Sequence, residues 1–381
     1  MSAGYAQTEV RLFRNRLNLL TGVRYEKTTD DGVGPVFEPG NAFVRNPNGT
    51  FARNVQGQRI RRPEAGAVGS LEELRLTREE RGFRASRSYD GFYPSLHLTF
   101  HVTDNFQARA AYAHTYGRPD FNEVIPNSTI SERDLDETQL GDPNVLRGTI
   151  DIRNSGLKPW TADNFDLSLE YYTPQGGLFT GGVFLKEIKD FFANSVRLAT
   201  LADLEELGLD PQYVGWQLST KFNSGSARVA GAEFNARHRL SPLGGWGRYS
   251  SVFFNATKLE LSGDRQADFS GFIPKNVNWG VTFTRKPVML IAKWNYRGEQ
   301  KGAAFTAFGP DGYNYTKARL TLDLSADYQI NKRLSLNTNI RNLFNEYLTM
   351  VRYGSQTPAY AQPRQYRHFG VYFSAGIKGT F

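Results

Sequence analysis

Apolar and polar residues alternate with a period of two along many segments of this chain. The pattern is clearest in residues 164–171, 277–284 and 320–329. Successive side chains of a β-strand point to opposite faces of the sheet, so this period predicts strands with one apolar and one polar face. We expect about thirteen such strands, near residues 5–13, 17–27, 93–102, 106–114, 163–172, 178–187, 227–240, 249–261, 276–286, 288–297, 316–330, 333–341 and 367–381.

The length of these segments favours a membrane wall over a soluble sheet. Most of them have about ten residues, and a tilted strand needs ~9 to 11 residues to cross a bilayer, against ~5 to 6 in ordinary soluble sheets. The sequence therefore predicts an all-β fold, a transmembrane antiparallel up-and-down β-barrel.

The connections between these segments alternate between short and long. The short ones, such as 14–16, 103–105, 173–177 and 331–332, are rich in turn-forming residues. An outer-membrane barrel has this pattern, with short periplasmic turns and long extracellular loops. We expect the extracellular loops at about 28–92, 115–162, 188–226, 262–275, 298–315 and 342–366.

Alternation alone does not say which face is outward, since a soluble lipocalin-like barrel places its apolar face inside. Aromatic residues stand toward both ends of the apolar faces, as in Phe165 with Tyr171 and Trp279 with Phe283, and so resemble the two interfacial girdles of a membrane barrel. Placing Asp166 in hydrocarbon would cost up to ~2 to 4 kcal/mol. The polar rows are therefore expected to face the lumen.

Composition excludes several classes of protein and of binding site. No apolar run approaches the ~18 to 20 residues of a membrane helix, and the chain has no cysteine for a disulfide or a thiolate metal site. The net charge of +8 comes from basic residues scattered among 38 acids, so nucleic acid is not an expected partner. Residues 1–20 lack the apolar core of a signal peptide.

Backbone pairing makes the chain look incomplete. An unpaired edge strand in hydrocarbon leaves many polar groups unsatisfied, so a membrane sheet must close, and bacterial single-chain barrels have an even number of strands. With about thirteen strands and the first beginning near residue 5, we expect further strands upstream.

Three motifs resemble those of TonB-dependent receptors. N-I-R-N-L-F-N-E-Y at 339–347, followed by a terminal strand ending in Phe381, resembles the C-terminal signature of that family. A-H-T-Y-G-R-P at 113–119 is similar to its S-x-x-x-R-P element. G-L-K-P at 156–159, leading into N-F-D-L at 164–167, is similar to its L-K-P-E strand start, with Trp160 where the family often has Glu.

The resemblance implies a bacterial outer-membrane barrel of twenty-two strands with an N-terminal plug. On that basis residues 1–381 are the C-terminal barrel portion, without the plug and without the TonB box. The resemblance further implies that the missing region couples transport to the TonB-ExbB-ExbD complex. It also implies that the barrel contacts lipopolysaccharide and other outer-membrane lipid. It also suggests that the barrel-assembly machinery reads the terminal aromatic Phe381.

Other candidate sites are weak. His97 and His101 would lie ~13 Å apart on a strand, too far to share a metal ion, and no Gly-x-Ser-x-Gly element accompanies the scattered histidines. Residues 70–73 and 202–207 predict short capped helices within loops. The basic run at 58–63 could attract anionic ligands but is more often a solvated loop.

We therefore expect no enzyme, no cofactor and no catalytic residue, and the substrate-binding residues cannot be named from the sequence. The leading hypothesis is active import of a scarce bulky solute, a siderophore, cobalamin or oligosaccharide, captured by the long loops. A passive porin or structural barrel is the first alternative and a barrel hydrolase the second.

Overall fold

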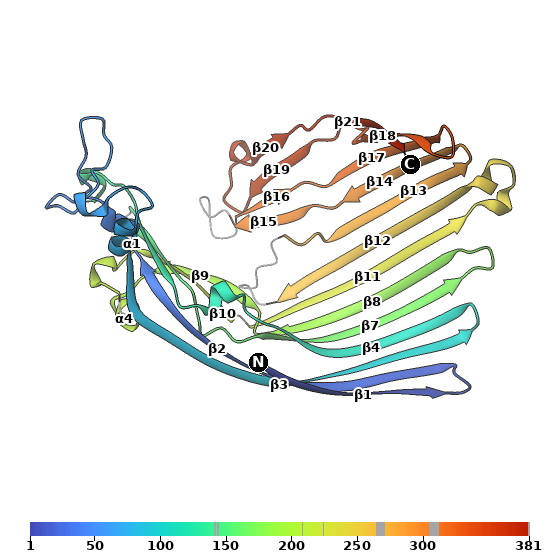
Figure 1. Cartoon of the computed structure of the whole chain (residues 1–381), viewed down its shortest axis with the longest axis horizontal. Coiled ribbons are helices and arrows are strands. Elements are labelled where there is room, and N and C mark those ends of the chain that lie inside the picture. Colours follow the sequence, from blue (N-terminus) through green and yellow to red (C-terminus); the bar gives the residue numbers. More distant parts are fainter. Residues whose placement is uncertain are drawn as a thin grey trace.

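The computed structural model describes residues 1–381 except 141, 143, 144, 208, 224, 264–270, 305–311, 380 and 381. All of the predicted strands are present, and each pairs antiparallel with the next to form one wall (Figure 1). The wall strands are β1 (Ser2–Leu12), β2 (Leu17–Phe37), β3 (Arg78–Thr103), β4 (Phe106–Gly117), β7 (Trp160–Tyr172), β8 (Leu178–Lys189), β11 (Ser226–Arg239), β12 (Ser250–Gly263), β13 (Lys275–Arg285), β14 (Val288–Arg297), β17 (Arg319–Gln329), β18 (Leu334–Arg341) and β21 (Tyr372–Gly379).

The register gives the wall two chemically different faces. On the lipid face, Phe165 pairs with Tyr112 and Leu185, and Leu167 is 52% exposed. On the luminal face, Gln107 pairs with Glu170. Rows of exposed apolar side chains are stable only against hydrocarbon. The apolar face of the wall is therefore the outer face, as predicted.

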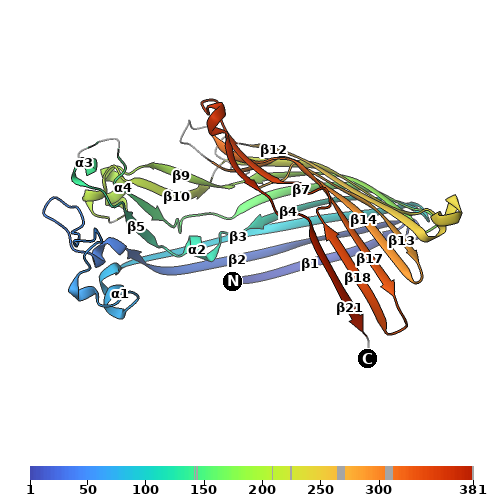
Figure 2. The ribbon, with the colours of Figure 1, turned by 90° about the horizontal axis from the view of Figure 1, so that it is seen from above.

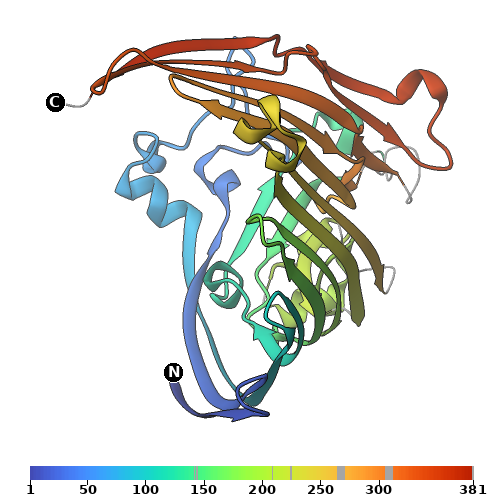
Figure 3. The same cartoon turned by 90° about the vertical axis from the view of Figure 1, so that its right-hand side faces the viewer.

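Figure 3 shows the wall as an open arc, with the N-terminal and C-terminal strands at its two ends. Within the described residues β1 pairs with β2, β21 pairs with β18, and these two edge strands do not pair with each other. Closure of a barrel would have to come from strands beyond this wall.

The loop predicted at 28–92 is wrong in part. The β2–β3 ladder continues far past the expected strand ends, from Lys27 opposite Asp90 to Phe37 opposite Arg78, with an irregularity between Gly34 and Val36. A smaller correction concerns the last strand, predicted from residue 367, which begins at Tyr372. Backbone pairing extends a strand beyond the apolar pattern wherever a partner strand is available.

Two more predicted loops, 115–162 and 188–226, contain an extension of the wall sheet that joins it at β2. Its strands follow the order β2-β5-β6-β10-β9, with parallel pairing of β2 to β5 and of β6 to β10. We call this part the extracellular subdomain, and Figure 2 shows it at the end of the wall opposite the short turns. Its new strands are β5 (Ser128–Glu132), β6 (Gly148–Ile152), β9 (Phe192–Leu198) and β10 (Gln217–Asn223).

The extracellular subdomain has its own hydrophobic core. Leu204 and Ile150 are fully buried there, and Trp216 is 5% exposed. A Cβ on Gly148 would come within 2.2 Å of the Trp216 ring, so only glycine leaves room for the indole. The core residues come from four separate segments, namely Val36, Ile130, Ile150, Ala199, Leu204, Leu209, Tyr213, Trp216 and Leu218.

The predicted loops 298–315 and 342–366 form a small four-stranded sheet, β15-β16-β19-β20. Residues 264–270 of the predicted loop 262–275 lie outside the described residues. The rings of Tyr315 and Tyr353 stack in it with centroids 4.1 Å apart. Its strands are β15 (Gln300–Ala304), β16 (Tyr313–Thr316), β19 (Leu348–Tyr353) and β20 (Pro363–Arg367).

Helices are short. The predicted loop helices are confirmed as α1 and α4, and among the described residues none is long and apolar enough to cross a membrane. The α-helices are α1 (Leu71–Thr77), α2 (Phe121–Val124), α3 (Glu137–Leu140) and α4 (Leu201–Glu206), and 3-10 turns include Pro39–Ala42, Pro63–Ala65, Pro211–Tyr213, Ser241–Leu243, Gly245–Tyr249 and Ala359–Ala361.

The two faces of β7 predict opposite responses to charge. We expect Leu167→Arg to destabilise the membrane-inserted wall by about 2 to 4 kcal/mol, because its guanidinium would enter hydrocarbon. The adjacent luminal variant Ser168→Arg should have a far smaller effect. Denaturant titration of each variant folded into lipid vesicles measures the difference, and equal destabilisation by both would refute the assignment of faces.

A second prediction compares a buried and an exposed leucine of helix α4 in the extracellular subdomain. Leu204→Ala should destabilise the subdomain by about 2 to 5 kcal/mol, since it leaves a cavity in a fully buried site. Leu201→Ala on the same helix, where the side chain is 49% exposed, serves as the control. Limited proteolysis of residues 190–223 should accelerate only in the Leu204 variant.

Candidate ligand-binding surface at the extracellular end

Residues 43–61 form a hairpin, called here the arginine hairpin, that ion pairs fasten to the segment after β5. Arg45 Nη1 donates to Glu132 Oε1 at 2.7 Å, and Arg59 Nε donates to Asp134 Oδ2 at 3.0 Å. Arg53 also pairs with Asp134. Three guanidinium groups thus hold two carboxylates, and the hairpin keeps a positive excess at this contact.

The same guanidinium groups lie over aromatic rings. Arg59 is 4.3 Å from the ring centroid of Phe51, and Arg45 is 4.8 Å from it. Arg59 also lies over Phe43 at 5.5 Å. Cation–π contacts of this kind contribute about 0.5 to 1 kcal/mol each at exposed sites. They orient the arginine side chains and so reduce the entropy lost when a ligand binds.

The charge pairs shift the pKa of the groups involved. Burial alone would raise the pKa of Asp134, but hydrogen bonds from Arg59 and Arg53 outweigh it and leave that pKa below its usual value. The hydrogen bond to Glu132 raises the pKa of Arg45. Both shifts favour the charged forms of Asp134 and Arg45 at neutral pH.

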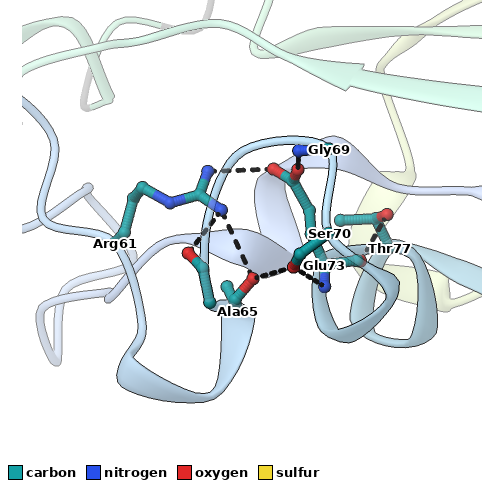
Figure 4. A network of polar contacts seen from close by, with 7 residues as sticks. Arg61, Ala65, Gly69, Ser70, Glu73 and Thr77 are labelled. Carbon is teal, nitrogen blue, oxygen red and sulfur yellow. Dashed lines mark hydrogen bonds and ion pairs between the residues drawn. The ribbon is translucent and has the colours of Figure 1, made fainter.

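A second contact docks helix α1 against the base of the hairpin (Figure 4). Ser70 Oγ accepts from the backbone N–H of Glu73 at 3.2 Å, as the predicted helix cap requires. The Glu73 carboxylate accepts from Arg61 Nη1 at 2.9 Å and from the backbone N–H of Gly69. The interpretation of residues 58–63 as a merely solvated run is therefore wrong, because Arg59 and Arg61 have fixed carboxylate partners.

Glu123, which is 8% exposed, links three elements of the extracellular subdomain. Its Oε1 accepts from Arg153 Nη1 at 3.0 Å and from Lys221 Nζ at 2.8 Å. These residues belong to α2, to the segment after β6 and to β10. One buried carboxylate thus joins two cationic side chains from separate segments of the subdomain.

A second buried carboxylate lies where β3 and β4 separate. Their register ends at Ser95 opposite Ala113, whereas β4 stays paired with β7 as far as Gly117. Glu26 of β2 lies at the resulting gap between β3 and β4 and is 5% exposed. Its carboxylate accepts a hydrogen bond from the Tyr116 hydroxyl and pairs with Arg118 and Arg24.

In this cluster Arg24 Nη2 is 2.7 Å from Glu26 Oε2, and Arg118 also donates to the Tyr116 hydroxyl at 2.6 Å. The motif segment 113–119 thus closes the split between two wall strands. Sequence reasoning missed Glu26 and Glu123, because their partners lie up to 98 residues away along the chain.

The N-L-F segment forms a turn at the extracellular end of β18. Asn342 has a φ of 56°, a left-handed conformation that asparagine tolerates better than most residues. Its Oδ1 accepts from the backbone N–H of Glu346 at 2.9 Å, and its Nδ2 donates to the carbonyl of Gly370 at 3.1 Å. The motif therefore fastens the last long loop to the start of β21.

The remaining candidate residues are not brought together. His97 and His101 both lie on β3, and the described residues contain no cluster of three metal-ligating side chains. His114 Nδ1 is 2.8 Å from Asp163 Oδ1, a pair that was not predicted. Phe381 lies outside the described residues. The arrangement is suited to recognition by cationic and aromatic groups.

Comparison with known proteins identifies the class. The family model described as TonB dependent receptor-like, beta-barrel matches residues 1–343. The chain belongs to this family, whose members are bacterial outer-membrane proteins, and its wall is an outer-membrane wall.

Solved structures share the fold at low identity. The copper transporter OprC superposes with a TM-score of 0.61 at 13% identity, over 100% of this chain and 49% of that chain. A mutant of the ferric enterobactin receptor PfeA from Pseudomonas aeruginosa, in complex with enterobactin, gives 0.57 at 14%, over 100% and 54%.

The siderophore receptor PirA from Acinetobacter baumannii gives a TM-score of 0.55 at 15% identity, over 100% of this chain and 54% of that chain. This chain therefore spans about half the length of the structures it resembles. A comparison with curated proteins found no match.

The ion pairs of Asp134 predict a pH-sensitive hairpin. A carboxyl whose pKa is lower in the folded than in the unfolded chain stabilises the fold above its ordinary value, 3.8 for Asp134, and loses that contribution as the pH falls below it. We expect amide hydrogen exchange of residues 43–61 to accelerate below about pH 4, beyond the intrinsic change of exchange rate with pH.

Two variants test the cause of this acceleration. Asp134→Asn should give fast exchange of the hairpin at neutral pH already, since the amide cannot replace the charge. Asp104→Asn, in the short turn between β3 and β4, is the matched control and should leave residues 43–61 unchanged. Protection that is the same in the Asp134 variant as in wild type would refute the role of these ion pairs.

Proposed function

We propose that this chain is the barrel portion of an active importer that captures a scarce, bulky solute with its extracellular end and moves it inward with TonB-coupled energy. The observation that carries the proposal is the folded extracellular end, in which oriented guanidinium and aromatic groups stand above a membrane wall of this family. A passive porin needs no such preorganised recognition surface. Members and structural neighbours of the family are transport receptors and not enzymes.

We infer that the open wall is completed by segments outside residues 1–381. Unpaired edges in hydrocarbon are unfavourable by several kcal/mol for each backbone group, which supports closure into the twenty-two-stranded barrel expected from the family motifs. A plug domain and the coupling segment for TonB-ExbB-ExbD would lie in that remainder. Recognition of Phe381 by the barrel-assembly machinery and contact with lipopolysaccharide belong to the same proposal.

The substrate class suggested by the extracellular end is anionic or aromatic. Residues 43–61 contribute four arginines and no acidic residue, and the half-buried ring of Phe43 lies beside Arg59. The named neighbours are a copper transporter and receptors for ferric enterobactin and siderophores. A ferric catecholate combines negative charge with aromatic rings, so it is the first candidate to test.

Coupled transport predicts that uptake by the protein in cells requires energy. We expect uptake of radiolabelled ferric enterobactin or cyanocobalamin to fall to background when the proton gradient is collapsed or TonB is deleted. Arg59→Gln should reduce ligand binding about tenfold, the effect of losing one charge-assisted hydrogen bond, whereas Arg62→Gln is the matched control. Uptake that persists without the gradient would contradict active import.

A further inference from the structure

A row of amide side chains crosses the luminal face of the wall. Asn235 of β11 pairs with Asn255 of β12, Asn255 pairs with Asn278 of β13, and Asn278 pairs with Asn295 of β14. The row, called here the asparagine row, is four strands wide. Cross-strand neighbours on one face have Cβ atoms about 5 Å apart, so the amides form a continuous polar strip.

Threonine hydroxyls extend the strip at both ends. Asn235 Nδ2 donates to Thr180 Oγ1 at 3.2 Å, and Asn295 Nδ2 lies 3.4 Å from Thr321 Oγ1. Register places Thr180 opposite Asn235 and Thr321 opposite Asn295. Six neighbouring strands therefore present neutral hydrogen-bond donors and acceptors at the same register position, and no member of the row is charged.

A groove of about 630 Å³ opens along this strip. Asn235 and Asn255 line it together with hydroxyl groups of Ser251 and Thr282, and Arg237 is its one charged residue. Register places all of these side chains on the luminal face. The volume lies in the range of sites for small organic ligands, about 300 to 1,000 Å³.

An aromatic ring forms part of the groove. Phe253 of β12 lines it and pairs with Gly280 of β13. A Cβ on Gly280 would come within 2.6 Å of the Phe253 ring, so the missing side chain lets the ring lie against the wall. Phe253 therefore places an apolar ring beside the polar strip. Phe253 and Asn255 are two residues apart on one strand, about 7 Å, close to the width of one hexose ring.

We propose that this groove is a saccharide subsite on the solute path through the lumen. A sugar ring has an apolar C–H face, which suits stacking on Phe253, and hydroxyl groups that both donate and accept, as amides do. The single cation Arg237 gives little selectivity for a polyanion. The hydroxyl groups of a neutral polyhydroxylated solute match the amides and hydroxyls of the groove, and Leu178, Ala236 and Val252 add apolar lining. The inference rests on the proposed import function and adds a neutral, hydroxyl-rich class of solute as an alternative to the anionic class suggested by the arginine hairpin.

Binding of short glycans to the purified full chain in detergent tests the subsite. The probes are maltotriose, xylotriose and triacetylchitotriose, measured by isothermal titration calorimetry. We expect at least one to bind, and Asn255→Leu to weaken that binding about five- to tenfold, because ligand hydroxyls would lose their partner. Phe253→Leu, which keeps an apolar side chain but removes the ring, should weaken it by a similar factor.

Asn276→Leu is the matched control, since Asn276 is a luminal asparagine of β13 outside both the row and the groove. It should bind the same glycan as wild type does. Binding of none of the three probes, or equal binding by wild type and Asn255→Leu, would overturn the saccharide subsite and identify the row as a contact surface for polypeptide only.

The two proposals fail in different ways. Uptake of ferric enterobactin or cyanocobalamin that requires TonB, together with no glycan binding, would leave the import function standing and remove this inference. Glycan binding that depends on Asn255, together with uptake that persists without a proton gradient, would support the subsite and contradict active import.

Discussion

The structure depends on one constraint, that backbone N–H and C=O groups inside a bilayer must pair with each other because no water is available to them. Thirteen wall strands meet it through continuous antiparallel ladders. Once the ladders are set, the alternation of side chains leaves only one arrangement with apolar residues against lipid. The polar residues of every strand then face the lumen together, and rows such as the asparagine row arise from register.

Beyond the membrane the same chain is stabilised differently. The extracellular subdomain buries Leu204, Ile150 and Trp216 as a soluble domain would, and carboxylates such as Glu123 and Asp134 join segments that the core does not reach. Each of these carboxylates pairs with two cations from other segments, so the ion pairs hold the loops together. Recognition and stability therefore use the same arginine side chains.

The lumen and the extracellular end offer a ligand different chemistry. The end presents guanidinium groups over aromatic rings, whereas the groove beside Asn255 presents amides, hydroxyls and one phenyl ring. A solute moving inward would exchange charge-assisted contacts for weaker neutral ones. Weak, closely spaced partners suit passage, because a strongly bound solute would be released slowly.

The sequence by itself determined the wall. Its period of two, the strand lengths and the alternation of short and long connections depend on local chemistry. Each of the thirteen predicted strands overlaps an observed wall strand, although β2 and β3 extend well beyond the pattern. The motif at 339–347 likewise indicated the family, and the helix caps at Ser70 and α4 could be recognised because a cap involves residues only a few positions apart.

Only the tertiary structure decided the rest. The extension of the wall sheet within 115–162 and 188–226 uses parallel pairs between distant segments, and short strands of that kind carry little periodic signal. Glu26 and Tyr116 are 90 residues apart, and the asparagine row exists only in the register of four strands. Contacts between distant residues depend on how strands align in space, which no local pattern encodes.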